Sequence, residues 1–418
     1  MIAATKTVQK SVDRFIARQP IFDRRRDVFG YELLFRASPE NFFPQGDGDL
    51  ASSTLIKDSL LLFGLDAITG DKRAFINVTR QMLVSDSAAV LPCERTVLEI
   101  LETIEPDEEV ILATKRLKDN GYTIALDDFA YRPEFEGLLD LADIVKVDFL
   151  ATASAQRERL ASHFRRRDLR LLAEKVETSE DLQEALDLGY SYFQGYFFCK
   201  PQVISRKEVP GLWGNYLKVL SLLNRPDTDF DELEHTIKHE VALSLKLLHY
   251  LNSANFGWRN RISSIKQALV LLGTINLRKW ASVVAFSSFC ENKPKELLTT
   301  SLCRARFCEL LAPLCGLGQR QLDLFLIGLL SVLDVAMDRS IVEVLQDLSL
   351  SADISDALLG GESPLGKLYS LVLAYERGNW ERVTSLAHDL GISSADIVGL
   401  YCQSIQWADE VNSERPPK

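Results

Sequence analysis

The chain has 418 residues, of which 46% are apolar and 26% charged, and its formal net charge is −11. This length predicts two domains, and the composition is typical of a soluble globular protein with a large core. The negative charge argues against general binding to nucleic acid or to anionic membranes, because few groups would neutralise phosphates. The seven cysteines lack CxxC spacing and indicate reduced thiols, and no apolar signal segment opens the sequence. We therefore expect a cytoplasmic protein that does not span a membrane.

The first 200 residues alternate between strand-like and helix-like patterns. Residues 15–23 and 28–36 flank a charged turn and predict an antiparallel hairpin. Further strands are predicted over residues 74–78, 96–101, 123–127, 144–148, 171–174 and 192–195, and helices over residues 53–63, 108–119, 155–166 and 180–188. Strands that alternate with helices form parallel βαβ units, and this many repeats predict a closed β/α barrel.

Polar side chains close nearly every one of these strands. They are Glu32, Asn77, Glu99, Asp127 with Asp128, Lys146, Glu174 and Gln194. The carboxyl ends of barrel strands meet at one mouth, so these side chains should face one cavity. Oxygen ligands without His or Cys suit Mg²⁺ or Mn²⁺, and two such ions can activate water against a phosphodiester. Taken alone, an Asp pair such as Asp127-Asp128 is more often the cap of a following helix than a metal site.

Seven motifs in residues 13–203 resemble, in order, those of EAL-domain cyclic-di-GMP phosphodiesterases. They are Tyr31–Arg36, Phe75–Asn77, Glu99–Glu102, Asp127–Phe129, Lys146–Asp148, Ala173–Glu177 and Gln194–Tyr196. The resemblance implies a modified (β/α)8, TIM-like barrel whose first strand is antiparallel. It also implies metal-dependent hydrolysis of cyclic di-GMP to the linear dinucleotide, with Mg²⁺ or Mn²⁺ as cofactor.

The same resemblance implies a role for each matched residue. Glu32, Asn77, Glu99 and Asp127 would hold one metal ion, and Asp127, Asp128 and Glu174 would hold or orient a second ion and its water. Lys146 would position that water and offset charge in the transition state. Gln19, Arg36 and Gln194 would contact the substrate or the metal-bound waters, and Glu102 would brace the loop after the Asp pair.

Two departures from the family pattern bear on activity. Glu-Ala-Leu is replaced by Glu32-Leu33-Leu34, and the loop that reads Gly-Thr-Gly-Tyr-Ser-Ser in the family is Ala130–Phe135 here. The loop has lost both glycines and has gained Pro133, which stiffens the chain. We therefore expect weak phosphodiesterase activity, and two alternatives stay open: an inactive sensor of cyclic di-GMP, or a scaffold that acts through protein contacts.

The second half is predicted to be all helical. Residues 205–400 resemble an HDOD domain, a relative of HD-type phosphohydrolases that lacks their metal ligands, and residues 401–418 are predicted to be a C-terminal tail. Leu324–Met337 reads as one central buried helix. His235 and His239 are one helical turn apart but have no third ligand, so no metal is expected there. The HDOD domain should bind an unknown protein partner, and a homodimer stays open.

Overall fold

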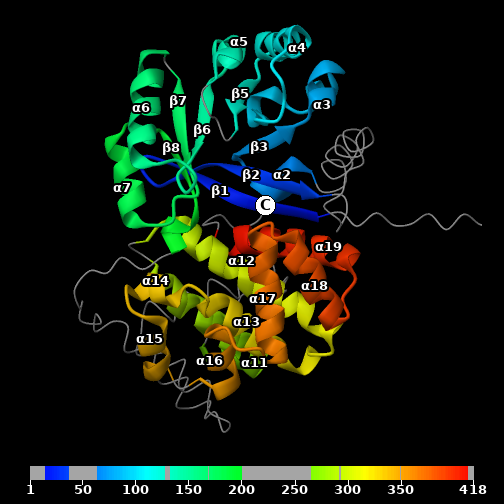
Figure 1. The fold of residues 1–418 in the computed structure, drawn as a ribbon. Coiled ribbons are helices and arrows are strands. Elements are labelled where there is room, and N and C mark those ends of the chain that lie inside the picture. Colours follow the sequence, from blue (N-terminus) through cyan, green and yellow to red (C-terminus); the bar gives the residue numbers. More distant parts are fainter. Residues whose placement is uncertain are drawn as a thin grey trace, which may run out of the picture.

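The computed structural model describes residues 15–36, 64–127, 132–167, 169–199, 265–290, 293–348 and 350–412. They form a β/α barrel followed by a helical half that packs against one side of it (Figure 1). The predicted helix over residues 53–63, and His235 and His239, lie outside these residues. Each helix within the described ranges is too short or too polar to cross a membrane.

Eight strands close the barrel in the order β1 to β8. They are β1 (Phe15–Asp23), β2 (Val28–Arg36), β3 (Arg73–Val78), β4 (Thr96–Ile100), β5 (Thr123–Leu126), β6 (Ile144–Asp148), β7 (Arg170–Glu174) and β8 (Tyr192–Gln194). β1 is antiparallel to both of its neighbours, β2 and β8, whereas the pairs from β2 to β8 are parallel. The predicted barrel with an antiparallel first strand is confirmed.

Helices on the outside of the barrel connect its strands. They are α2 (Leu65–Thr69), α3 (Arg80–Val84), α4 (Glu108–Asp119), α5 (Glu136–Leu139), α6 (Ser154–Phe164) and α7 (Ser179–Asp187). The start of α4 follows from its sequence, since the Asp107 carboxylate accepts a hydrogen bond from the Val110 N–H. α7 begins with a capping box between Thr178 and Asp181. These caps fix where the helices begin relative to the strands that carry the site.

In its described part the second half is entirely helical. Its α-helices are α11 (Ile265–Phe289), α12 (Lys295–Leu311), α13 (Gln321–Leu330), α14 (Leu333–Met337), α15 (Ile341–Asp347), α16 (Ala352–Leu358), α17 (Pro364–Glu376), α18 (Trp380–Leu390) and α19 (Ser394–Asn412). α11 is kinked at Gly273, which has a φ of 67°. α12 and α13 cross closely at Gly328, where a Cβ atom would lie 2.5 Å from the Ala305 nitrogen.

Two predictions about this half are wrong. The single helix predicted over Leu324–Met337 is two helices, because the chain leaves helical geometry at Val332, whose φ and ψ are −127° and 25°. A run that is apolar on most of its faces does not show where such a break falls. Residues 401–412 of the predicted tail are instead the second part of α19, in which Ile405 and Ala408 are fully buried against the rest of the molecule.

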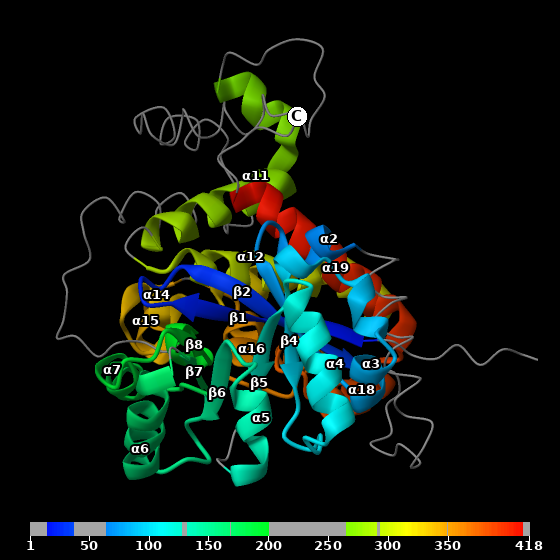
Figure 2. The ribbon, with the colours of Figure 1, turned by 90° about the horizontal axis from the view of Figure 1, so that it is seen from above.

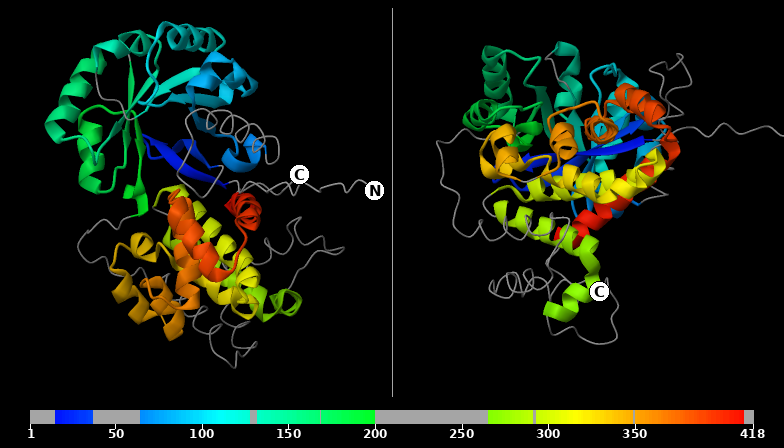
Figure 3. Two further views of the ribbon diagram at one scale, coloured as in Figure 1. Left: turned by 45° about the vertical axis from the view of Figure 1, so that its right-hand side comes forward. Right: turned by 90° about the horizontal axis from the view of Figure 1, so that it is seen from below.

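The helical half lies along the β1–β2 hairpin and also contacts the outer helix α2. Figure 3 shows the hairpin as the layer of the barrel nearest to α12, α17 and α19, and from above α19 runs beside α2 (Figure 2). The Phe15 ring at the start of β1 stacks on Trp380 of α18, with ring centroids 5.2 Å apart. The hairpin is thus shared between the two halves.

Candidate functional site

Alternation along the strands divides the barrel interior into an apolar floor and a polar layer. The floor consists of Ile21, Phe75, Val97, Ala125, Ile144, Leu172 and Tyr192. In β3 to β8 the side chain two residues further on belongs to the polar layer, because side chains in a strand alternate between the two faces. These partners are Asn77, Glu99, Asp127, Lys146, Glu174 and Gln194. In the antiparallel β1 the partner of Ile21 is Gln19, two residues earlier.

β2 follows the same rule with a glycine in the floor. Gly30 precedes Glu32 by two residues, and a Cβ atom at Gly30 would lie 2.9 Å from the Phe75 ring. The missing side chain leaves room for that ring, so a large floor residue on β3 fills the space of two strands. Glu32 therefore stands in the polar layer above Phe75.

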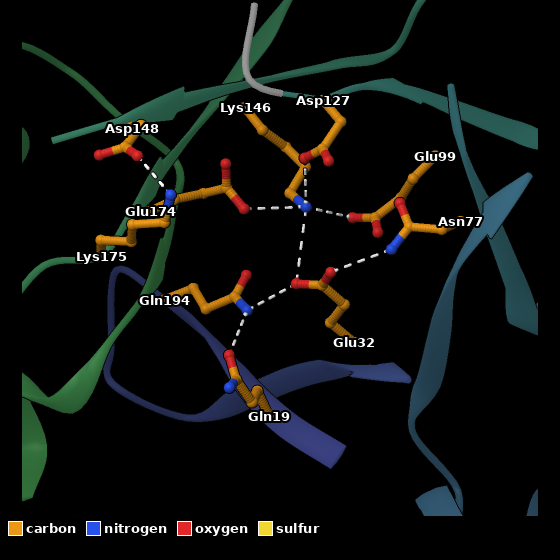
Figure 4. A network of polar contacts seen from close by, with 10 residues as sticks. All are labelled: Gln19, Glu32, Asn77, Glu99, Asp127, Lys146, Asp148, Glu174, Lys175 and Gln194. Atoms are coloured by element: carbon orange, nitrogen blue, oxygen red, sulfur yellow. Dashed lines mark hydrogen bonds and ion pairs between the residues drawn. The ribbon is translucent and has the colours of Figure 1, made fainter. Parts of the chain in front are cut away.

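The Lys146 ammonium lies at the centre of the polar layer (Figure 4). Its Nζ is 2.8 Å from Glu99 Oε1, 2.7 Å from Asp127 Oδ1 and 2.9 Å from Glu174 Oε1. Glu32 Oε2 lies further away, at 3.5 Å. Both Lys146 and Glu99 are fully buried. If all four carboxylates are ionised, one ammonium leaves an excess of three negative charges in a largely buried space.

Three amide side chains complete the layer around Glu32. Gln194 Nε2 donates hydrogen bonds to Glu32 Oε2 at 2.7 Å and to Gln19 Oε1 at 3.1 Å, and Asn77 Nδ2 donates to Glu32 Oε1 at 3.3 Å. Gln194 is fixed by its neighbour Gly195, which has a φ of 146° and where a Cβ atom would lie 2.1 Å from the Val176 carbonyl oxygen. Only glycine fits that position, which explains the Gln-Gly sequence.

The expectation that these residues end their strands needs correction for two of them. Glu32 lies in the middle of β2 and Lys146 in the middle of β6. β2 continues past Glu32 because it pairs with β1 as far as Arg36. Lys146 reaches the mouth from deeper in the barrel because its side chain is long. The polar side chains meet because each lies on the inward face of its strand. Their distance from the end of the strand matters less.

Burial and mutual repulsion set the proton affinities in this layer. Burial raises the pKa of Glu99 well above its usual range, repulsion from Glu32 adds to the rise, and Lys146 opposes it. Burial also raises the pKa of Glu174 to about 8. Burial acts to raise the pKa of Glu32 as well, but Lys146 and the two amide donors hold it below its ordinary value. Although burial disfavours the ammonium of Lys146, the surrounding carboxylates keep its pKa well above the usual value.

The described part of the structure does not place three of the predicted site residues in this cluster. Asp128 lies outside the described residues, as does the segment from there to Tyr131, and Arg36 ends β2 with a side chain that is not described. Glu102 is exposed, and its backbone carbonyl accepts a hydrogen bond from Arg132 Nη2 at 3.4 Å. The predicted bracing by the Glu102 carboxylate stays a prediction.

Lys175 and Asp148 form a second polar contact beside Glu174. Lys175 adopts a left-handed backbone with φ 54°, a conformation that glycine adopts without strain. Its ammonium pairs with Asp148 (Figure 4), and the Asp148 carboxylate also accepts hydrogen bonds from the N–H groups of Leu150 and Ala151. The sequence motif pointed to Asp148, but its partner could not be read from the sequence.

The donor set suits a hard divalent cation. Asn77 Oδ1 and Glu99 Oε2 are buried oxygens without a hydrogen-bond partner among the described residues. Such unpaired oxygens, beside surplus negative charge, are what Mg²⁺ and Mn²⁺ bind. Within the described ranges no three His, Cys, Asp or Glu side chains are arranged to hold an ion, and the Lys146 ammonium lies between the carboxylates. A cation would compete with this ammonium for the same oxygens.

The fold and the polar layer define the class to which the chain belongs. Residues 49–201 match the EAL domain and residues 209–354 match the HDOD domain. The chain belongs to the family of proteins that join an EAL domain to an HDOD domain.

Two curated relatives align with nearly the whole chain. The chain is 36% identical to the cyclic di-GMP phosphodiesterase CdgJ of Vibrio cholerae over 404 residues, which are 95% of this chain and 93% of that protein. It is 34% identical to the uncharacterized protein YuxH of Bacillus subtilis over 401 residues, 94% of this chain and 97% of the other. A solved structure of the EAL-domain protein YkuI of Bacillus subtilis, in complex with substrate cyclic di-GMP and calcium, is 19% identical, with a TM-score of 0.38, and the match covers 55% of this chain and 72% of that one.

Proposed function

We propose that the chain hydrolyses cyclic di-GMP to the linear dinucleotide at the mouth of the barrel, with Mg²⁺ or Mn²⁺ bound by the polar layer. The observation that carries the proposal is the buried group of Glu99, Asp127 and Glu174 around Lys146, with unpaired oxygens on Glu99 and Asn77. The relative from Vibrio cholerae is named a cyclic di-GMP phosphodiesterase, and the match to it extends over nearly the whole chain.

The roles proposed for the residues follow from their charge and placement. Glu32, Asn77, Glu99, Asp127, Asp128 and Glu174 would hold the metal, which when bound supplies positive charge to the phosphate and lowers the pKa of water. Lys146 would align the attacking water and stabilise negative charge on the phosphoryl oxygens. Gln19, Gln194 and Arg36 would orient the dinucleotide. In the reaction one water oxygen bonds to phosphorus, one bond from phosphorus to a ribose oxygen breaks, and that oxygen takes a proton.

A second candidate is a sensor that binds cyclic di-GMP without cutting it. It is favoured by the loop Ala130–Phe135, in which Pro133 starts a 3-10 turn and both family glycines are absent. Hydrolysis needs the water aligned with phosphorus, and a misplacement of about 1 Å can cost on the order of a hundredfold in rate. Binding tolerates more, because it sums many contacts. We therefore expect slow turnover and measurable binding.

The test compares turnover with binding in the full chain. Linear dinucleotide is measured by chromatography with Mg²⁺ or Mn²⁺, and binding of cyclic di-GMP is measured by calorimetry with Ca²⁺. We expect Glu99→Gln to abolish turnover, while Glu105→Gln, at an exposed position after β4, leaves it unchanged. Grafting Gly-Thr-Gly-Tyr-Ser-Ser in place of residues 130–135 should raise the rate. Binding without turnover would establish the sensor, and absence of both would leave a scaffold that acts through protein contacts.

A further inference from the structure

The helical half covers an open edge of the barrel. β1 pairs with β2 along its length, but its other edge meets β8 only from Ile21 to Asp23. The earlier residues therefore need other partners for the backbone groups that face away from β2. Those groups belong to every second residue, namely Ile16, Arg18 and Pro20.

Two tyrosine hydroxyls from the helical half bind this edge. Tyr375 of α17 donates to the Ile16 carbonyl oxygen at 2.9 Å and accepts from the Ile16 N–H at 3.4 Å. Tyr401 of α19 accepts from the Arg18 N–H at 3.4 Å. Pro20, the next residue on the same edge, has no N–H to satisfy. The hydroxyls thus take the place of a neighbouring strand along the first part of β1.

Outward side chains of the hairpin are held by the same half. The Arg18 guanidinium lies 4.3 Å from the centroid of the Tyr31 ring and 3.8 Å from the Asp409 carboxylate of α19. The Tyr31 hydroxyl donates to Glu296 Oε2 at 3.1 Å. Arg18, Tyr31 and Glu296 are all buried.

Each of these outward residues has an inward neighbour in the site. Gln19 follows Arg18 and Glu32 follows Tyr31, and the two inward residues are paired in register across the hairpin. Gln194 donates a hydrogen bond to each of them. A shift of β1 relative to β2 therefore moves the Gln19 amide away from Gln194.

A small cavity lies where this amide pair meets the helical half. Gln19 and Gln194 line it from the barrel, and Glu296, Cys303 and Tyr401 line it from the helices. Its volume of about 50 Å³ has room for water but not for a nucleotide. The helices thus form one wall of the cavity beside Gln19 and Gln194, the amide residues proposed to orient the dinucleotide.

We infer that the helical half positions the substrate-binding amides of the barrel, with Tyr375 and Tyr401 as positioning residues that act through the edge of β1. The inference rests on the proposed binding of cyclic di-GMP. Of the proposed metal ligands, Glu99, Asp127 and Glu174 come from β4, from the residue that follows β5, and from β7, away from this edge. Glu32 lies on β2, which stays paired with β3 on its other side when β1 loosens. Loosening of the edge should therefore weaken binding of the dinucleotide and leave binding of the metal unchanged.

The test uses the full chain with the double substitution Tyr375→Phe and Tyr401→Phe, which removes the two hydroxyls and keeps the rings. Tyr369→Phe is the matched control, because Tyr369 is a buried tyrosine of α17 within the helical half. We expect the dissociation constant for cyclic di-GMP, measured with Ca²⁺, to rise about tenfold in the double variant. The dissociation constant for Mn²⁺ should change less than twofold, and the backbone N–H groups of Ile16 and Arg18 should exchange hydrogen faster than in the control.

The outcomes separate this inference from the proposed function. If the wild type binds the dinucleotide and the double variant binds it equally well, the positioning role is wrong while the proposed function stands. If the affinities for cyclic di-GMP and Mn²⁺ fall together, or if the control loses as much affinity as the double variant, the effect is general and the inference is overturned. If the wild type itself binds no dinucleotide, both proposals fail.

Discussion

Lys146 is the residue on which the electrostatics of the barrel mouth depend. Its fully buried ammonium contacts three carboxylates at 2.7–2.9 Å, and a fourth lies at 3.5 Å. An internal cation of this kind stabilises the carboxylates while no metal is bound. The same ammonium competes with a metal for their oxygens, so stability and metal affinity should respond in opposite directions when it is removed.

Replacement of this lysine by methionine tests that opposition. Loss of one partner from a buried ionic group costs about 3–5 kcal/mol, so Lys146→Met should unfold at a markedly lower temperature without metal. Mn²⁺ should raise the melting temperature of the variant more than that of the wild type, although the variant should have no turnover. Lys115→Met, at an exposed position of α4, is the control. Equal stabilisation of variant and wild type by Mn²⁺ would show that the ammonium and the metal do not compete.

Asp127 should dominate metal binding, because its carboxylate is proposed to contribute to both ions. It is held in place by its N–H, which donates to the Ile100 carbonyl oxygen at 3.0 Å and so continues the β4–β5 ladder past the end of β5. We expect Asp127→Asn to reduce Mn²⁺ affinity by at least a hundredfold in calorimetry. Glu105→Gln provides the comparison at an exposed carboxylate. An affinity like that of the wild type in Asp127→Asn would exclude the bridging role.

At the scale of elements, the sequence predicted the strands well because alternation and β-branched residues mark them clearly. The hairpin strands have the predicted bounds, and the bounds of the predicted helix over residues 108–119 match those of α4. The packing between strands could not be predicted in the same way. The Phe75 ring fills the space left by the missing side chain of Gly30 on the neighbouring strand, and such a fit leaves no periodic signal in the sequence. The division of α13 from α14 was missed for a similar reason, because the run is apolar on most of its faces.

The close crossing of α12 and α13 depends on one glycine. A methyl group at Gly328 would meet the backbone of Arg304 and Ala305 at 2.5 Å, so the helices would have to separate. We expect Gly328→Ala to lower the free energy of unfolding by about 1–3 kcal/mol. Gly399 lies inside α19 with open space around it, so Gly399→Ala should instead raise the free energy of unfolding by up to about 1 kcal/mol. Urea unfolding of both variants is the measurement, and a neutral Gly328→Ala would contradict the packing role.

At the scale of the whole molecule, the contact between the halves could not be read from the sequence. Arg18 sits in a strand pattern that predicts an exposed charge, yet it is buried against residues almost 400 positions later. Glu296 is similarly buried near the start of α12, where an acidic residue is ordinary. Neither position carries a local signal, because burial here comes from the docking of one half on the other.

Glu296 should make this contact sensitive to pH. Burial raises its pKa to about 7, while Arg18 and the Tyr31 hydroxyl oppose the rise and Asp409 and Glu376 add to it. Because the carboxyl binds its proton more tightly in the folded state, its contribution to stability is complete below about pH 4.5. That contribution is lost as the pH rises through 7, and amounts to on the order of 3 kcal/mol. Glu296→Gln should therefore gain stability relative to the wild type between pH 5 and pH 8.

Urea unfolding at several pH values measures this difference. Glu362→Gln, an exposed glutamate in the loop before α17, should run parallel to the wild type over the same range. A constant difference between Glu296→Gln and the wild type from pH 5 to pH 8 would show that Glu296 does not titrate in the folded protein within this range.

The tyrosine-covered edge of β1 also bears on what happens if the halves come apart. A barrel freed from its helices would present the backbone groups of Ile16 and Arg18 next to the apolar side chains of Phe15 and Ile16, which are fully buried in the intact chain. A bare strand edge of this composition is a template for pairing with another copy, and Pro20 protects only its inner end. The helical half would thus also guard against aggregation, and proteolytic loss of α17 to α19 should turn the barrel into a self-associating species.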